Sequence, residues 1–233
     1  TETAGHLVTD KGENLLHIYL KIDDQNRATA ILPHSEMGQG AQTALTQMLA
    51  EELDADWDLM RFEEAPADGA YANMALGRGY LFAGVNFPDA VVPTVDGLVL
   101  KLADALGMQI TGGSMSIRST GQYFIRAAGA AVREMLVNAA SKAWGVPQDE
   151  IRTANSKLYH DTSGRSAPYS EFAAAAARVT PSSTPKLKKT QTFNTYITPY
   201  LVEEQRCLYT PGIIERVCGI SDFYTIPAEK IIT

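Results

Sequence analysis

The 233-residue chain is poor in the residues on which several common kinds of site depend. Its two cysteines, Cys207 and Cys218, are too few for a disulfide framework or an all-cysteine metal site, although they can form one bridge. The four histidines are scattered without His-x-His or His-x3-His spacing, so we expect no metal site built from protein side chains. No stretch reaches the roughly 18 unbroken apolar residues that span a bilayer, and we find no signal peptide.

Basic residues are also in the minority. Lys and Arg number 20 against 27 Asp and Glu, which gives a formal net charge of -7. This balance argues against a broad contact with a phosphate backbone, so we expect no nucleic-acid partner. Hydrophobic residues make up 45% of the chain, an ordinary share for a globular protein with a core.

Hydrophobic patterning predicts an α+β fold, with helices packed on a mixed or antiparallel sheet. Strands are expected over 15–22, 27–33, 58–64, 151–155 and 157–160, with a turn at 23–26. Helices are expected over 41–53, 88–106, 121–144 and 168–178. The helix over 121–144 carries a face of small residues that predicts close packing, namely Ala127, Ala128, Ala130, Ala131, Ala139 and Ala140. Proline, serine and lysine predict a linker over 180–189, between a domain over 1–179 and a tail of unknown role over 190–233.

Two glycine-containing loops lie just before predicted helices. They are Met37-Gly38-Gln39-Gly40 and Thr111-Gly112-Gly113-Ser114-Met115-Ser116. Glycines let the backbone approach a ligand, and free N–H groups at a helix start favour anions such as phosphate. The hydroxyls and the Gln39 amide add neutral donors and acceptors, so the loops suggest a polar, phosphate-bearing organic ligand. The alternative, a turn and a helix cap, is the more frequent meaning of such spacing, and neither loop fits the dinucleotide or Walker motifs.

Three charged residues near these loops allow two interpretations each. Glu36 is a general base or, more often in such a position, a capping or dipole partner of the helix start. Arg118 and Arg126 pair with a phosphate, or else belong to a solvated face or a salt bridge.

A larger set of motifs resembles one family. The motifs are Pro33-His34-Ser35-Glu36-Met37-Gly38-Gln39-Gly40-Ala41-Gln42-Thr43, Ala50-Glu51-Glu52-Leu53, Tyr71-Ala72-Asn73, Thr111 to Arg118, Ala127 to Leu136, and Trp144-Gly145-Val146-Pro147. In this order, from about Leu16 to Lys189, they resemble large subunits of the isoquinoline 1-oxidoreductase type, within the xanthine oxidase and aldehyde oxidase family of molybdenum hydroxylases.

The resemblance implies a molybdopterin cofactor, in the cytosine dinucleotide form that bacterial members use. It implies cofactor contacts from two sets of residues: Met37, Gly38, Gln39 and Gly40, then Thr111, Gly112, Gly113, Ser114 and Ser116. Family chemistry is hydroxylation of an N-heterocycle or aldehyde with oxygen from water, and electrons leave through 2Fe-2S clusters on a small partner subunit. The cofactor's dithiolene holds the metal. Many relatives are periplasmic, where Cys207 and Cys218 would form a disulfide; otherwise the location is cytoplasmic and they are two buried thiols.

The chain also departs from the family pattern. Family large subunits are several times longer, and neither their catalytic glutamate nor their Gly-Gly-x-Phe-Gly loop has a counterpart here. Residues 190–233 match no family segment. We therefore expect an amino-terminal fragment, from a truncated or frameshifted gene or from a split subunit, that is inactive without the rest of the large subunit. The catalytic residues are unknown. The alternative is a non-catalytic α+β remnant or assembly module that binds no cofactor.

Overall fold

The computed structural model describes residues 8–72, 90–112 and 116–189, together with Phe82, Val85 and Pro88. The chain divides into two units between Leu187 and Lys188, and every element below belongs to the first unit. The proposed linker over 180–189 and tail over 190–233 stay predictions. The whole of that tail, with Cys207 and Cys218, lies outside the described residues.

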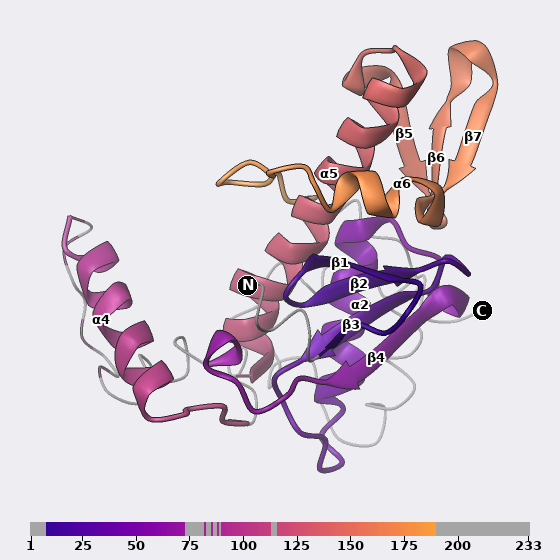
Figure 1. Cartoon of the computed structure of the whole chain (residues 1–233). Helices are drawn as coiled ribbons and strands as arrows, with labels where there is room; N and C mark the ends of the chain where they lie inside the picture. The colour runs from indigo at the N-terminus through magenta and orange to yellow at the C-terminus, as the bar shows by residue number, and fades with distance from the viewer. Residues whose placement is uncertain are drawn as a thin grey trace, which may run out of the picture. The chain divides into compact units, whose positions relative to one another are not determined.

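The first sheet has four strands in the order β1-β2-β3-β4 (Figure 1). They are β1 (Glu13–His17), β2 (Leu20–Asp23), β3 (Ala28–Leu32) and β4 (Met60–Glu64). The first three pair antiparallel and β4 pairs parallel with β3, so this sheet is mixed, which is one of the two forms expected from the sequence. The single strand predicted over 15–22 is wrong. A turn at Ile18 and Tyr19 breaks it, and Tyr19 becomes buried with its ring 6.0 Å from that of Tyr71.

The unit β3–α2–β4 positions the first glycine loop. Helix α2 (Ala41–Leu53) has the predicted bounds, and residues 33–40 connect the end of β3 to its start. Since β3 and β4 are parallel, the residues that follow both strands lie at one edge of the sheet. This is the edge at which open α/β sheets place their ligands.

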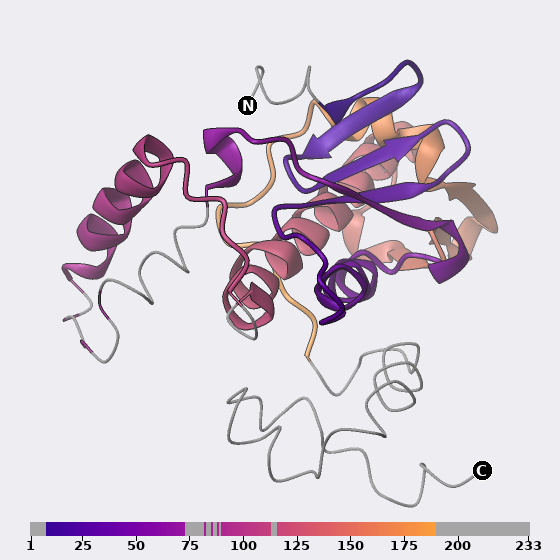
Figure 2. The same ribbon diagram turned by 90° about the horizontal axis from the view of Figure 1, so that it is seen from below.

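Helix α5 (Arg126–Trp144) is preceded by a π-helical segment over Ser116–Ile125. The helix predicted over 121–144 therefore begins later as α-helix, and Ser116 belongs to a helical turn rather than to a loop. The predicted close packing of the small face is confirmed. A Cβ atom added at Gly129 would lie 2.8 Å from the Leu49 carbonyl oxygen, so α5 and α2 touch backbone to backbone (Figure 2).

The second sheet is an antiparallel sheet of three short strands. These are β5 (Ile151–Ala154), β6 (Lys157–His160) and β7 (Arg165–Pro168), followed by helix α6 (Tyr169–Ala176). The predicted β5–β6 hairpin is confirmed, with Asn155 and Ser156 both at positive φ in its turn. Strand β7 was not predicted from the sequence.

Ser156 joins this hairpin to distant parts of the chain. Its amide donates to the Asp54 carbonyl, and its hydroxyl accepts from the Asp56 amide. Its carbonyl accepts from Asn26 Nδ2, while Asn26 Oδ1 accepts from the Ser170 amide. The turn between β2 and β3 is thus tied to residues more than a hundred positions later.

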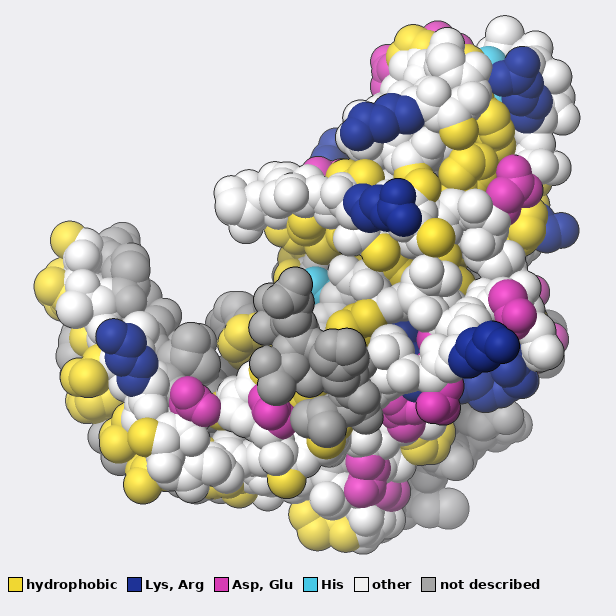
Figure 3. Space-filling model, in the orientation of Figure 1, with side chains coloured by type: hydrophobic (Ala, Val, Ile, Leu, Met, Phe, Trp, Pro, Cys, Tyr) yellow, Lys and Arg dark blue, Asp and Glu magenta, His cyan; other side chains and the backbone are white. Residues whose placement is uncertain are grey.

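Helix α4 (Val92–Ala105) lies within the span predicted over 88–106 and has a proline in its first turn. Several of its apolar side chains are exposed, including Leu98 and Leu102 (Figure 3). None of the described helices has the length and hydrophobicity needed to span a bilayer. Together the elements confirm the α+β class.

Candidate functional site

The first glycine loop lies on the surface at the carboxyl end of β3. Residues 35–39 are exposed, and the side chain of Met37 is 69% exposed. Gly38 and Gly40 have φ values of 89° and 72°, which favour glycine, and a Cβ atom added to either would meet nothing within 4 Å. There is consequently open space above the backbone of this loop.

The amides of the loop are not free, which corrects the expectation from the sequence. Glu36 Oε1 accepts from the amides of Gly38 at 2.8 Å and Gly40 at 2.9 Å, and Oε2 accepts from Gln42 at 3.3 Å. Desolvation acts to raise the pKa of Glu36, but hydrogen bonds from the backbone amides outweigh it and leave the pKa below its ordinary value. Glu36 is thus a capping partner of the loop and of α2, and the structure supports this interpretation over the general base.

Gln39 closes the loop on its other side. Its Oε1 accepts from the Met37 amide at 2.6 Å, and its Nε2 donates to the Ser35 carbonyl at 2.9 Å. A carboxamide carries two N–H donors and two lone pairs on oxygen. One donor and one acceptor of the exposed Gln39 side chain thus stay available to a ligand.

The second loop meets the first. The Ser35 amide donates to Thr111 Oγ1 at 2.9 Å, and the Gly112 amide donates to Ser116 Oγ at 2.9 Å. Ser116 is fully buried, so its hydroxyl holds the second loop from inside. Gly113 and Ser114 lie outside the described residues.

His34 forms another link in the same place, which sequence patterning did not indicate. It is 2% exposed, and its Nε2 lies 2.8 Å from Thr120 Oγ1 in the π-helical segment. Burial lowers the pKa of His34 to about 4, so the imidazole is neutral at pH 7. The loop after β3 is therefore fixed to the second loop through Ser35 and to the following helix through His34.

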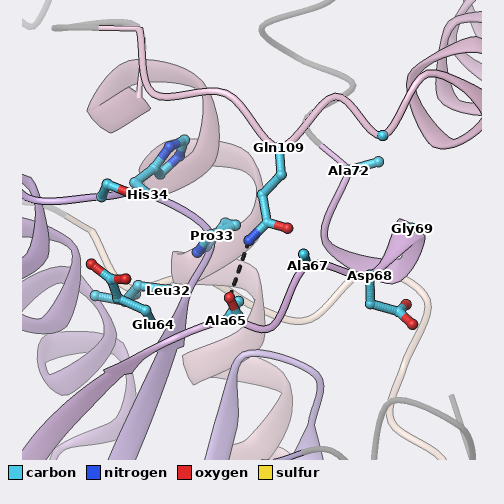
Figure 4. Close-up of a pocket in the computed structure, with 12 residues that line it drawn as sticks. Leu32, Pro33, His34, Glu64, Ala65, Ala67, Asp68, Gly69, Ala72 and Gln109 are labelled. Atoms are coloured by element: carbon cyan, nitrogen blue, oxygen red, sulfur yellow. Dashed lines mark hydrogen bonds between the residues drawn. The ribbon is translucent and has the colours of Figure 1, made fainter.

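A cavity of about 390 Å³ lies beside this junction, at the ends of β3 and β4 (Figure 4). Its lining includes His34, Ser35, Glu64, Asp68 and Gln109. Gln109 reaches across to the Ala65 carbonyl, to which its Nε2 donates at 3.3 Å. The described members of the two predicted loops, residues 37–40, 111–112 and 116, do not line the cavity.

Arg126 does not face a ligand. Its Nη2 lies 2.6 Å from Glu52 Oε1, and its Nε donates to the same oxygen at 2.8 Å. The salt bridge interpretation is correct for Arg126, and the side chain of Arg118 lies outside the described part. In the described ranges, His, Cys, Asp and Glu do not gather into a metal site.

No family model matches the chain. The isoquinoline 1-oxidoreductase subunit beta of Brevundimonas diminuta is 33% identical over 162 residues, which make up 68% of this chain. The chain belongs to the molybdenum hydroxylase family. The chain spans only 17% of that relative's length.

The chain is also similar to a membrane-bound aldehyde dehydrogenase of Gluconacetobacter polyoxogenes. That relative is 26% identical over 139 residues, 60% of this chain and 13% of the relative, and its name gives pyrroloquinoline quinone. Among solved structures, quinoline 2-oxidoreductase from Pseudomonas putida 86 matches with a TM-score of 0.41 and 14% identity. The match covers 67% of this chain and 15% of that one. This last similarity is too remote to carry structural detail to this chain.

Proposed function

We propose that this chain binds a molybdopterin cofactor through residues 37–40, 111–114 and 116. The observation that carries the proposal is the hydrogen bond from the Ser35 amide to Thr111 Oγ1. It brings together two loops that are 76 positions apart and that both resemble cofactor loops of the family. The position of this junction after parallel strands adds support.

The described residues fit such a group in access and in polarity. The space above Gly38 and Gly40 is open, Met37 offers an exposed apolar side chain, and Gln39 keeps a free donor and acceptor. Gln39, Met37, Thr111 and Gly112 would contact the cofactor directly. Gly38 and Gly40 would contact it through the open side of their backbone rather than through their amides. Ser116 would act by holding the second loop, and Gly113 and Ser114 belong to the proposal on their sequence alone.

The reaction we propose is hydroxylation of an N-heterocycle or an aldehyde with oxygen from water. The bound cofactor would supply the molybdenum centre that takes up the electrons of the substrate. Because the chain spans 17% of its relative, we propose that activity requires the rest of the large subunit and a small 2Fe-2S subunit. The cytosine dinucleotide form of the cofactor and a periplasmic location belong to the same proposal.

Two alternatives have observations of their own. The amides of the first loop are taken by Glu36 and the cavity lies outside the loops, which favours a module that binds no cofactor. The name of the second relative gives a quinone in place of a pterin.

A direct analysis of the purified chain tests these possibilities. The full chain is produced in a host that makes molybdopterin, and bound molybdenum, pterin and pyrroloquinoline quinone are measured per mole of protein. We expect molybdenum and pterin, with no quinone. We expect Gln39→Ala to reduce pterin retention without changing the thermal midpoint, whereas Gln148→Ala, at another exposed glutamine, retains pterin.

Three results would contradict the proposal. A well-folded chain without pterin or molybdenum leaves only the assembly module. Bound quinone would move the chain to the chemistry named for the second relative. A thermal midpoint that is lower in ligand-free Gln39→Ala than in the ligand-free wild type would make Gln39 a structural residue.

A further inference from the structure

The carboxylate of Glu36 lies among the backbone amides that a ligand anion would otherwise use. Both of its oxygens accept hydrogen bonds: Oε1 from Gly38 and Gly40, and Oε2 from Gln42. Gly40, the residue just before α2, has no capping side chain of its own. Glu36 therefore supplies the negative charge at the positive end of this helix.

A concave set of backbone amides at a helix start binds one anion. Here a carboxylate of the chain has that place. A phosphate on the same amides would lie within a few ångströms of Glu36, and two like charges at that distance repel each other. The phosphate and the carboxylate thus exclude one another.

The loop nevertheless offers contacts to a ligand that carries no charge at this point. Gln39 is exposed and is fixed by its bonds to the Met37 amide and the Ser35 carbonyl. Among the described residues, its remaining N–H and lone pair have no hydrogen-bond partner. These are the contacts suited to a ring carbonyl, a ring N–H or an oxo group.

We propose that Glu36 is a positioning and specificity-determining residue of the cofactor loop. Its carboxylate holds the loop amides together, keeps the phosphates of the ligand away from the start of α2, and leaves Gln39 as the polar contact. This role of Glu36 rests on the proposed function, which assigns the ligand. It refines that function by excluding the anionic part of the cofactor from residues 36–42.

The experiment uses the ¹⁵N-labelled full chain and inorganic pyrophosphate as the probe. Amide chemical shifts of Gly38, Gly40 and Gln42 are followed during titration of the wild type, Glu36→Gln and Glu171→Gln. Glu171 is the matched control, because it is an exposed glutamate in the first turn of α6. We expect the chemical shifts of the three amides to stay unchanged on addition of pyrophosphate in the wild type and in Glu171→Gln. In Glu36→Gln they should bind it at least about tenfold more tightly.

Amide hydrogen exchange in the same samples tests the positioning role. We expect the three amides to be protected in the wild type and to exchange faster in Glu36→Gln. Wild-type amides that shift with pyrophosphate as strongly as those of the variant would overturn the proposal. So would a Glu36→Gln chain whose loop amides stay protected and yet gain no binding. If the variant loop loses its order, the wild-type titration alone decides the exclusion.

These outcomes are separate from those of the proposed function. Pterin and molybdenum content decides whether the chain holds the cofactor, whereas the pyrophosphate titration requires no cofactor. A chain that retains pterin while its wild-type loop amides bind pyrophosphate would keep the proposed function and refute the role of Glu36.

Discussion

Replacing Gly129 by alanine tests the close contact between α5 and α2. The new Cβ atom would lie 2.8 Å from the Leu49 carbonyl oxygen and 2.8 Å from Glu52 Cβ, and neither atom belongs to a flexible side-chain end. The two helices must therefore separate by several tenths of an ångström. Overpacking costs about 1–3 kcal/mol, and two contacts at 2.8 Å with atoms that cannot turn aside put this site in the upper part of that range, at about 2–3 kcal/mol. The alanine recovers about 1 kcal/mol of helix propensity. We expect a net loss of about 1–2 kcal/mol.

Urea denaturation followed by circular dichroism measures this loss. The dependence of the unfolding free energy on urea concentration should stay unchanged. In thermal denaturation, the midpoint of a chain of this size should fall by about 2–8 °C. Gly97→Ala is the control, because Gly97 lies inside α4 and its added Cβ atom would meet nothing within 4 Å. That variant should be as stable as the wild type or more stable. A Gly129→Ala chain at least as stable as the wild type would refute the packing argument.

Three further predictions follow from the described contacts. Arg126→Ala leaves the fully buried Glu52 without its closest cation, so unfolding free energy should fall by about 3–5 kcal/mol, and the charge-free pair Glu52→Leu with Arg126→Met should be more stable than the single variant. Burial lowers the pKa of His34 from 6.5 to about 4, so the unfolded chain binds the extra proton. His34 should therefore contribute a stability loss of about 3 kcal/mol as pH falls from about 6.5 to 4, beside a similar contribution from His17, and the total loss should be smaller by about that amount in His34→Gln. Thr111→Val removes the acceptor of the Ser35 amide, which should then exchange its hydrogen faster while Thr111→Ser keeps the wild-type rate.

The elements with a clear local signal could be predicted from the sequence. Helix α2 was predicted because its apolar residues recur at helical spacing directly after Gly40. The β5–β6 hairpin was predicted because Asn155 and Ser156 lie between two strand patterns, and both adopt positive φ in the turn. The turn between β1 and β2 was not, since Ile18 and Tyr19 carry no turn signal and the packing of Tyr19 against Tyr71 decides it. Strand β7 is four residues long, has a single buried residue and ends in a proline, so its pattern is too weak to detect.

In the candidate site, too, the features with a local sequence signal could be predicted and those that depend on tertiary packing could not. Loop positions follow from their glycines, but the bond between Ser35 and Thr111 joins segments 76 positions apart and depends on tertiary packing. Sequence spacing suggested Glu36 as a cap, yet it could not show that one carboxylate would collect the amides of Gly38, Gly40 and Gln42. The amides assumed to be free were the part of the hypothesis that the sequence could not test.

The partners of Asn26 constrain how this protein is made in the cell. Asn26 is synthesised early, but Ser156 and Ser170, to which it bonds, are added 130 and 144 residues later. At a translation rate of about 5–20 residues per second, the hydrogen bonds of Asn26 to Ser156 and Ser170 cannot form until roughly 7–30 seconds after Asn26 is synthesised. During that interval the hairpin of β2 and β3 is exposed at the ribosome without its anchors, where a chaperone that binds nascent chains would protect it.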